Sequence, residues 1–451
     1  MIMNVLSLIS IKRWSRALLL GAPLLAAQAV VPGLLHTYVD QLQVGIAFAQ
    51  DGESAEPERK TKRTQAMNNK VYEQLQAAQE AVEAKDVAGA LEILNDLKNG
   101  RRKLNDAEMA NVLNMDAFIY YGKEDYPNAI KAYASIIKLP EAPEGTVIQA
   151  RYSLAQLYFV TEDYKKGVES LLDWFKVTDA PTASAYMLLS QGQYQLKDYD
   201  QALKNVEIAI NMYKEKGKVP KENWYGLQRF LYYEKENYRK VVEILNELLT
   251  HYPKKQYWLQ LSGMYSELKD ERQQLNAMET AYVQGMLDQE KELINMASLF
   301  LLNEVPYKAG KVLDKGIKEK VIEPTSKNLE LLGNSWRAAQ EIKKAIPEMA
   351  KAASKSDSGD LWARLCNVYL DNDEFKQAVE SCDKALQKGG VKRPDTAYLV
   401  KGMAHYNLKQ YKSAQSAFEK AAKDKRSKEY ADQWMKYMKT ELERQQSLEQ
   451  S

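Results

Sequence analysis

Apolar residues recur along most of this 451-residue chain at the three- and four-residue spacing that places them on one side of an α-helix. From Asn69 onward, short polar turns, often Asp-Tyr, interrupt the helical pattern at regular intervals. The clearest copies are GQYQLKDYDQALKNVEIAI, from Gly192 to Ile210, and GMAHYNLKQYKSAQSAFEKA, from Gly402 to Ala421. The pattern predicts pairs of helices joined by tight turns and repeated along the chain.

Ten copies align on one turn residue, the anchor, which opens the second helix of each predicted pair. The anchors are Val87, Tyr126, Tyr164, Tyr199, Tyr238, Glu271, Pro306, Ile342, Phe375 and Tyr411. Three residues after the anchor and nine before it, most copies carry a small residue; Arg229, Val241 and Gln274 are exceptions. Seven residues after the anchor, every copy carries a larger or apolar residue such as Leu94 or Phe418. Small residues at both positions predict close packing of the two helices, with an apolar face behind them.

This pattern resembles the tetratricopeptide repeat, a helix-turn-helix unit of about 34 residues. The resemblance spans residues 70–425 and implies an all-α fold, an α-solenoid of about ten such repeats. After the last repeat, residues 426–451 place Tyr430, Trp434 and Tyr437 on one helical stripe. We interpret this segment as a capping helix and tail that close the end of the stack, and the alternative is an independent partner-binding helix.

The first 49 residues have the order of an export signal. Lys12, Arg13 and Arg16 precede an apolar run from Ala17 to Leu35, and Ala47-Phe48-Ala49 supplies a small-x-small cleavage site. Residues 1–49 are therefore predicted to be a signal peptide, with cleavage after Ala49. The alternative is a retained N-terminal anchor in the inner membrane, and either reading places the body in the periplasm. Residues 50–69 are polar and alternate in charge, which predicts a flexible linker.

Composition narrows the function. The chain carries 63 Lys and Arg against 61 Asp and Glu. This nearly neutral balance argues against a nucleic acid as the binding partner. Its three histidines are far apart, and no zinc spacing, phosphate-binding loop or dinucleotide motif occurs. The sequence therefore predicts no enzyme, no metal site, no cofactor, no small-molecule substrate and, after signal cleavage, no stable membrane insertion.

The partner-binding residues are predicted on the inner surface of the solenoid. The first helix of each repeat lines that surface, and in the tetratricopeptide family its exposed positions lie twelve, eight and five residues before the anchor. In repeats two to five these positions hold aromatic rings, and the candidates are Phe118, Tyr121, Tyr152, Phe159, Tyr194, Phe230 and Tyr233. Aromatic residues dominate binding hot spots, which favours a partner site here. The alternative is that single rings only pack between neighbouring repeats.

Cys366 and Cys382 are the only cysteines, and they occupy facing core positions of the ninth repeat. In an oxidising compartment such a pair forms a disulfide, and otherwise two buried thiols fill the same space.

Two functions are compatible with these features. One is a periplasmic, non-enzymatic scaffold for a protein partner in the cell envelope. The other is an envelope-biogenesis accessory that binds glycan or another cell-wall polymer, because carbohydrate sites also use exposed aromatic rings. The general layout, with a long signal followed by divergent repeats, is similar to the tetratricopeptide component that accompanies some TonB-type energy-transduction systems. That resemblance implies a protein partner from a TonB system.

Overall fold

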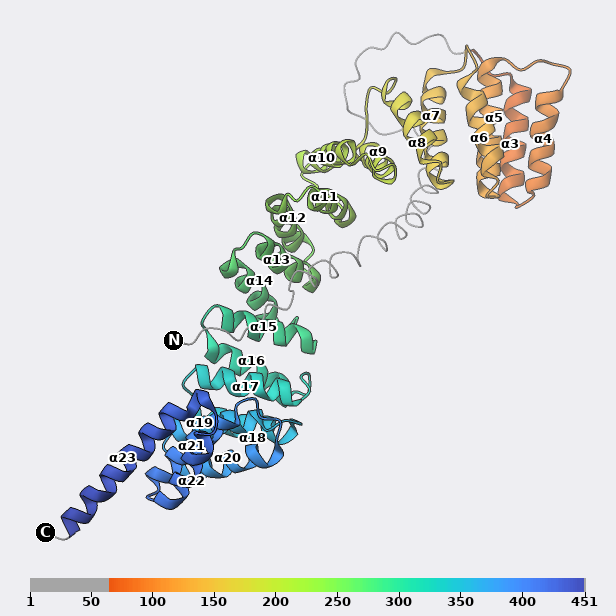
Figure 1. Ribbon diagram of the computed structural model, residues 1–451. Coiled ribbons are helices and arrows are strands. Elements are labelled where there is room, and N and C mark those ends of the chain that lie inside the picture. Colours follow the sequence, from red (N-terminus) through yellow and green to blue (C-terminus); the bar gives the residue numbers. More distant parts are fainter. Residues whose placement is uncertain (1–64, 450–451) are drawn as a thin grey trace. The chain divides into compact units, whose positions relative to one another are not determined.

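The computed structural model describes residues 65–449 as helices joined by turns, with no strand among them (Figure 1). The predicted signal or anchor, residues 1–49, lies outside the described residues, as does most of the predicted linker. None of the described helices is long and apolar enough to cross a membrane.

Ten helix pairs and one final helix make up the described part of the chain. The first helices of the pairs are α3 (Asn69–Glu83), α5 (Asp106–Gly122), α7 (Glu144–Val160), α9 (Ala183–Gln195), α11 (Glu222–Glu234), α13 (Lys255–Glu267), α15 (Glu290–Leu302), α17 (Ser326–Ala338), α19 (Asp360–Asp371) and α21 (Pro394–Asn407). The second helices are α4 (Val87–Asn99), α6 (Tyr126–Ile137), α8 (Tyr164–Phe175), α10 (Tyr199–Glu215), α12 (Tyr238–His251), α14 (Glu271–Val283), α16 (Pro306–Lys318), α18 (Ile342–Lys355), α20 (Phe375–Lys388) and α22 (Tyr411–Ala421). The final helix is α23 (Lys425–Glu449). Each predicted anchor is the first residue of a second helix, so the all-α fold with about ten helix-turn-helix repeats is confirmed.

The turn inside each pair has one backbone form. In the first pair, Lys85 adopts φ 63°, and the N–H of Asp86 reaches back to the carbonyl of Ala81 at 2.8 Å. This is the left-handed helix ending in which a late N–H satisfies a carbonyl that the helix itself leaves unpaired. The residue two before the anchor has positive φ in all ten pairs, and none of these residues is glycine.

The Asp of the recurrent Asp-Tyr pair begins the second helix. The carboxylate of Asp86 accepts a hydrogen bond from the N–H of Gly89 at 2.9 Å, and Asp or Asn caps the second helix in the same way in the first six pairs. Such caps satisfy a donor that the first turn leaves unpaired. In the last four pairs Val305, Glu341, Glu374 and Gln410 stand there, and none makes a side-chain cap.

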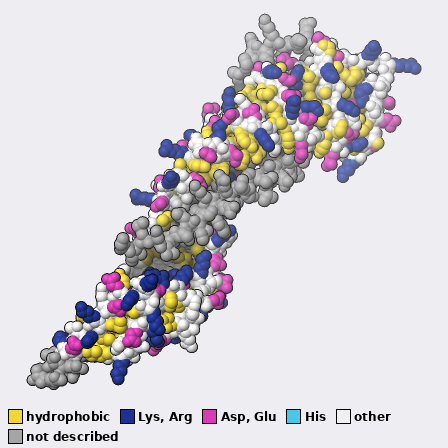
Figure 2. All heavy atoms as spheres, in the orientation of Figure 1, with side chains coloured by type: hydrophobic (Ala, Val, Ile, Leu, Met, Phe, Trp, Pro, Cys, Tyr) yellow, Lys and Arg dark blue, Asp and Glu magenta, His cyan; other side chains and the backbone are white. Residues whose placement is uncertain are grey.

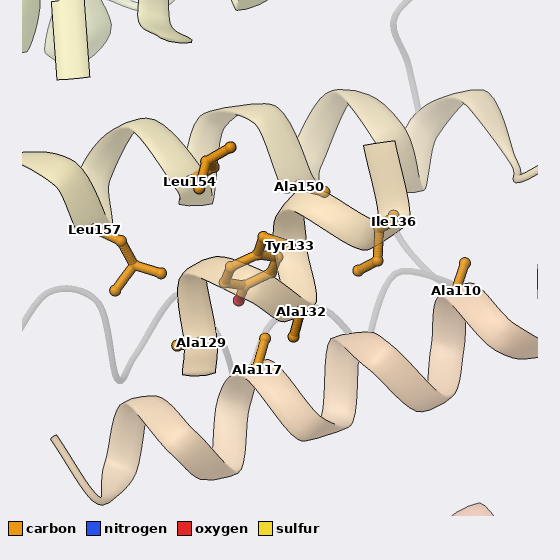
Figure 3. Close-up of a cluster of buried hydrophobic side chains, with 9 residues drawn as sticks. All are labelled: Ala110, Ala117, Ala129, Ala132, Tyr133, Ile136, Ala150, Leu154 and Leu157. Atoms are coloured by element: carbon orange, nitrogen blue, oxygen red, sulfur yellow. The ribbon is translucent and has the colours of Figure 1, made fainter. Parts of the chain in front are cut away.

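Packing follows the small-residue positions. In the second repeat, Ala117 of α5 and Ala129 of α6 are fully buried, and the ring of Tyr133 fills the space beside them. Figure 3 shows this ring on α6, with Ala117 of α5 on one side and Leu154 and Leu157 of α7, in the next repeat, on the other. Each repeat therefore buries its apolar face only when the next repeat stacks on it.

Acidic residues at the start of first helices join neighbouring repeats. Asp106 accepts a hydrogen bond from the N–H of Glu141 at 2.8 Å, and Asp360 accepts one from the N–H of Lys392 at 2.7 Å. Asp395 likewise accepts one from the hydroxyl of Ser427 at 2.7 Å, which ties α23 to α21. A carboxylate in the first turn is also favoured by the helix dipole. These bonds hold successive first helices in register.

The contacts divide the chain into two compact units, one up to Gln260 and one from Leu261. All seven predicted aromatic site residues belong to the first unit, and both cysteines belong to the second. Figure 2 shows hydrophobic side chains interspersed among charged ones on the visible face of both units.

Candidate partner-binding face

The seven predicted rings lie on four successive first helices, α5, α7, α9 and α11, and we call this set the aromatic face. It consists of Phe118, Tyr121, Tyr152, Phe159, Tyr194, Phe230 and Tyr233. Within the set, exposure and contacts differ from ring to ring, so the face contains both packed and accessible rings.

Rings five residues before the anchor pack against the aromatic anchor of their own repeat. The ring centroids of Tyr121 and Tyr126 are 6.0 Å apart, and those of Tyr233 and Tyr238 are 5.9 Å apart. Tyr194 stacks on Tyr199 at 5.9 Å. These rings are half-buried, so part of each ring surface remains accessible to solvent.

Tyr152 and Phe159 of α7 are half-buried and pack against neighbouring side chains and glycines. Tyr152 contacts Trp174 of its own repeat, with centroids 4.8 Å apart. A Cβ on Gly192 would lie 2.4 Å from the ring of Phe159, and one on Gly167 would lie 3.1 Å from it. The Phe159 ring therefore occupies space that one glycine of its own repeat and one of the next repeat leave open, and it lies 6.3 Å from its anchor Tyr164.

Phe118 and Phe230 differ from the other rings. Phe118 is 39% exposed and has no aromatic neighbour among the described residues, which makes it the most accessible ring of the seven. Phe230 meets Tyr194 edge to face at 5.4 Å and so joins α11 to α9. The accessible rings thus extend over neighbouring repeats, with Phe118 at one end.

Polar and ionisable groups accompany the rings of the aromatic face on some of its helices and not on others. Helix α9 carries no charged residue, and the pKa of the Tyr194 hydroxyl is raised by burial and by the nearby Tyr199 and Glu234. On α7, the side-chain oxygen of Gln156 and Nε of Arg151 are buried without a hydrogen-bond partner in the described part of the chain. Gln156 lies between Tyr152 and Phe159 on the same helical side, so an unpaired but buried acceptor lies beneath these rings.

A buried ion pair lies on the other side of α5. The Nζ of Lys98 is 2.5 Å from an Asp116 oxygen, and Asp116 is 3% exposed. Burial raises the pKa of Asp116, although Lys98 opposes that change. This pair joins the first two repeats and takes no part in the aromatic face.

Arg229, the exception among the small positions, is accommodated by contacts that the sequence pattern did not indicate. Its guanidinium lies over the ring of Tyr257, 5.8 Å from the centroid, and donates to the side-chain oxygen of Gln260. Burial lowers its pKa, while the nearby Tyr257 and Glu222 act in the opposite direction. The long side chain thus reaches α13 instead of separating α11 from α12.

Sequence reasoning missed a second aromatic cluster at the end of the second unit. Tyr406 lies 5.9 Å from Tyr411, 5.7 Å from Trp434 and 5.7 Å from Tyr437, measured between ring centroids. The signal was present, because Tyr406 stands five residues before its anchor, as Tyr194 does. Burial and a hydrogen bond with Tyr437 raise the pKa of Tyr406 to about 12.

Cys366 on α19 and Cys382 on α20 form a disulfide, with Cα atoms 5.3 Å apart. It joins the two helices of the ninth repeat, and both residues are fully buried. Within residues 65–449 no cluster of His, Cys, Asp or Glu is suited to hold a metal ion.

No protein-family model matches the chain, and no curated protein matches it. Among solved structures, it is similar to the crystal structure of MamA protein, with 18% identity and a TM-score of 0.32 over 39% of this chain and 94% of that one. It is also similar to a tetratricopeptide repeat protein from Parabacteroides merdae ATCC 43184, with 13% identity and a TM-score of 0.33 over 55% of this chain and 94% of that one. The APC/C hetero-tetramer Cut9-Hcn1 aligns with 13% identity and a TM-score of 0.28 over 82% of this chain and 77% of that one. The repeat fold is assigned from the chain's own helix pairs.

Proposed function

We propose that this protein is a non-enzymatic scaffold that holds a protein partner on the aromatic face. The observation that carries the proposal is the accessible ring of Phe118, 39% exposed, at the end of a series of half-buried rings on neighbouring repeats. Exposed aromatic side chains give large contact area at low entropic cost. Helix α9 carries no charged residue, which favours a partner segment that is itself uncharged where it meets this helix.

The proposed location is the periplasm, and the support is the signal-like order of residues 1–49. The mature chain then begins at Gln50. N-terminal sequencing of protein from the periplasmic fraction tests this start. A chain that begins at Met1 and pellets with the inner membrane supports the anchored alternative instead.

Within that compartment, the proposed partner is a component of a TonB-type energy-transduction complex. The support is the general layout of the sequence, a long signal followed by divergent repeats. The alternative partner is a glycan or another cell-wall polymer. Crosslinking in cells separates the two, because a protein partner gives a defined crosslinked species. A polymer partner gives retention of the chain on peptidoglycan or polysaccharide.

The decisive experiment uses Phe118→Ala, because this ring is exposed and has no aromatic neighbour among the described residues, so its removal should leave the fold nearly intact. We expect partner binding to weaken by about 2 kcal/mol, the scale of an interface hot spot. Tyr194→Ala should weaken binding as well and also lower stability, since Tyr194 packs on Tyr199 and Phe230.

Tyr72→Ala is the matched control. Tyr72 is 62% exposed on α3 in the same unit, outside the aromatic face, and its loss should leave binding unchanged. A photo-crosslinking residue at position 118 should capture the partner, and one at position 72 should not. Full binding by Phe118→Ala, Tyr121→Ala and Tyr233→Ala, each folded, contradicts the proposal.

A further inference from the structure

Helix α23 occupies the place that the first helix of an eleventh repeat would take. Asp395 binds Ser427 across 32 residues, and Asp360 binds Lys392 across the same 32 residues at the preceding junction. Ser427, Ala431 and Met438 of α23 are buried, which places one side of the helix on the last repeat. The opposite side of α23, which we call its uncovered side, is exposed at Tyr430, Gln433 and Lys436.

Two large exposed rings stand where the uncovered side of α23 meets the packed side, and Tyr437 also contacts Tyr406 and Trp434. Tyr430 is 61% exposed and Tyr437 is 56% exposed, and their seven-residue spacing puts them on one line along the helix. Gln433 lies between them, and Glu429 and Lys436 run parallel to them on the far edge of the same side. One edge of this side is therefore aromatic and the other edge is charged.

The charges of α23 are mostly satisfied within the helix. Lys428 pairs with Asp432 at 2.9 Å, and Arg444 pairs with Glu441 at 2.7 Å. Lys439 lies 4.0 Å from Glu443. In contrast, Glu429 and Lys436 have no ion pair in the described part of the chain. They are opposite in sign and seven residues apart, too far along one helix to bind each other.

We propose that a second copy of this chain docks on the uncovered side of α23, with the two α23 helices antiparallel about a twofold axis near Gln433. In an antiparallel pair with twofold symmetry, the same edge of each helix meets the same edge of the other. Tyr430 then packs against the partner's Tyr437, and Glu429 lies opposite the partner's Lys436. The twofold axis repeats both contacts, so the surface is complementary to itself in shape and in charge.

Charge reversal tests the proposal, because a capping helix with no second copy docked on it would not respond to these substitutions. The full chain should sediment as a dimer at about 100 µM, and Glu429→Lys and Lys436→Glu should each weaken the dimer about tenfold or more, because each places like charges opposite each other twice. The double variant Glu429→Lys/Lys436→Glu should dimerise like the wild type. Mixing the two single variants should restore association, as a heterodimer.

Two further variants guard against indirect effects. Lys439→Glu reverses a charge outside the proposed contact and should leave the dimer intact. Tyr430→Ala removes a ring that makes no aromatic contact within the described residues, and it should dissociate the dimer without lowering helix content. A wild-type chain that stays monomeric at about 100 µM overturns the proposal. So does a dimer that both single charge reversals leave unchanged.

Discussion

The hydroxyl of Ser427 donates a 2.7 Å hydrogen bond to the carboxylate of Asp395, which also accepts from the guanidinium of Arg393 at 2.6 Å. Asp395 is 4% exposed and lies in the first turn of α21, and Ser427 lies near the start of α23. This side-chain bond links the closing helix to the last repeat. A buried carboxylate with these partners contributes to stability only while it is ionised.

Replacing Asp395 with Asn should destabilise the junction by about 1.5–3 kcal/mol at neutral pH, the usual range for hydrogen bonds to a charged group. Its contacts with Arg393 hold the pKa of Asp395 well below the ordinary value, and burial opposes them. Because the folded pKa is depressed, the contribution is complete above the unfolded pKa, near 3.9, and is lost as the pH falls through the folded pKa. The difference in unfolding free energy between wild type and Asp395→Asn should therefore be flat from about pH 7 to 5 and shrink below about pH 4. A difference that does not change with pH contradicts this account.

Reducing the disulfide between Cys366 and Cys382 should loosen the end of the second unit first. Closing a loop of about fifteen residues stabilises by about 3 kcal/mol in the chain-entropy model. Since repeat stability is a sum of local terms, amide exchange should rise in α17 to α22 and stay unchanged in α3 to α8. If α19 and α20 have the same amide-exchange protection before and after reduction, the disulfide does not stabilise this repeat. If both thiols are free in protein isolated from the periplasm, the disulfide does not form there.

Gly402→Ala should be destabilising despite the higher helix propensity of alanine. A Cβ on Gly402 would lie 2.5 Å from Cε1 of Phe418, a ring that is fully buried and stacked on Trp434. Overpacking of this kind costs about 1–3 kcal/mol. Gly226→Ala is the control, because a Cβ there meets nothing within 4 Å, and it should stabilise α11 by about 0.5–1 kcal/mol. Denaturant unfolding of both variants gives the comparison, and an equal response to the two changes refutes the packing argument.

Lys197→Gly should stabilise the fourth repeat. Lys197 adopts φ 63°, a conformation that costs a residue with a Cβ about 1–2 kcal/mol. Glycine removes that strain but adds about 0.4–1 kcal/mol of unfolded-state entropy, which leaves a net gain of about 0.5–1 kcal/mol. Lys204→Gly, inside α10, lacks the strain and should destabilise by about 1 kcal/mol. Similar losses in both variants, measured by thermal unfolding, contradict the strain argument.

The helix pairs were predictable because their signals are local and repeat along the chain. Ala117, Ala129 and Tyr133 stand at fixed distances from Tyr126, so one alignment located both helices and the core between them. The alignment predicted the start of the second helix correctly even at Glu271 and Pro306, because the spacing of the neighbouring repeats located those turns.

The site was less predictable, because exposure depends on contacts between repeats. Phe118 and Phe159 are the same residue type at positions expected to be exposed, yet Gly192 in the following repeat leaves space that Phe159 fills. Arg229 was an anomaly in the pattern, and its position over Tyr257 follows from a side-chain conformation that no spacing rule specifies. The bond between Asp395 and Ser427 joins residues 32 apart and has no local signal.

Hydrogen bonds in the described part of the chain join residues that are close together in sequence, and this affects how the protein responds to force. The hydrogen bond of longest sequence range in the described chain joins Asn68 to Glu108, only 40 residues apart. Under a pulling force applied to the ends of either unit, tension therefore passes through each repeat in series, and repeats yield one after another. In the ninth repeat the disulfide between Cys366 and Cys382 prevents the segment between them from extending when the chain is pulled. Oxidation thus sets how far that end of the protein can stretch.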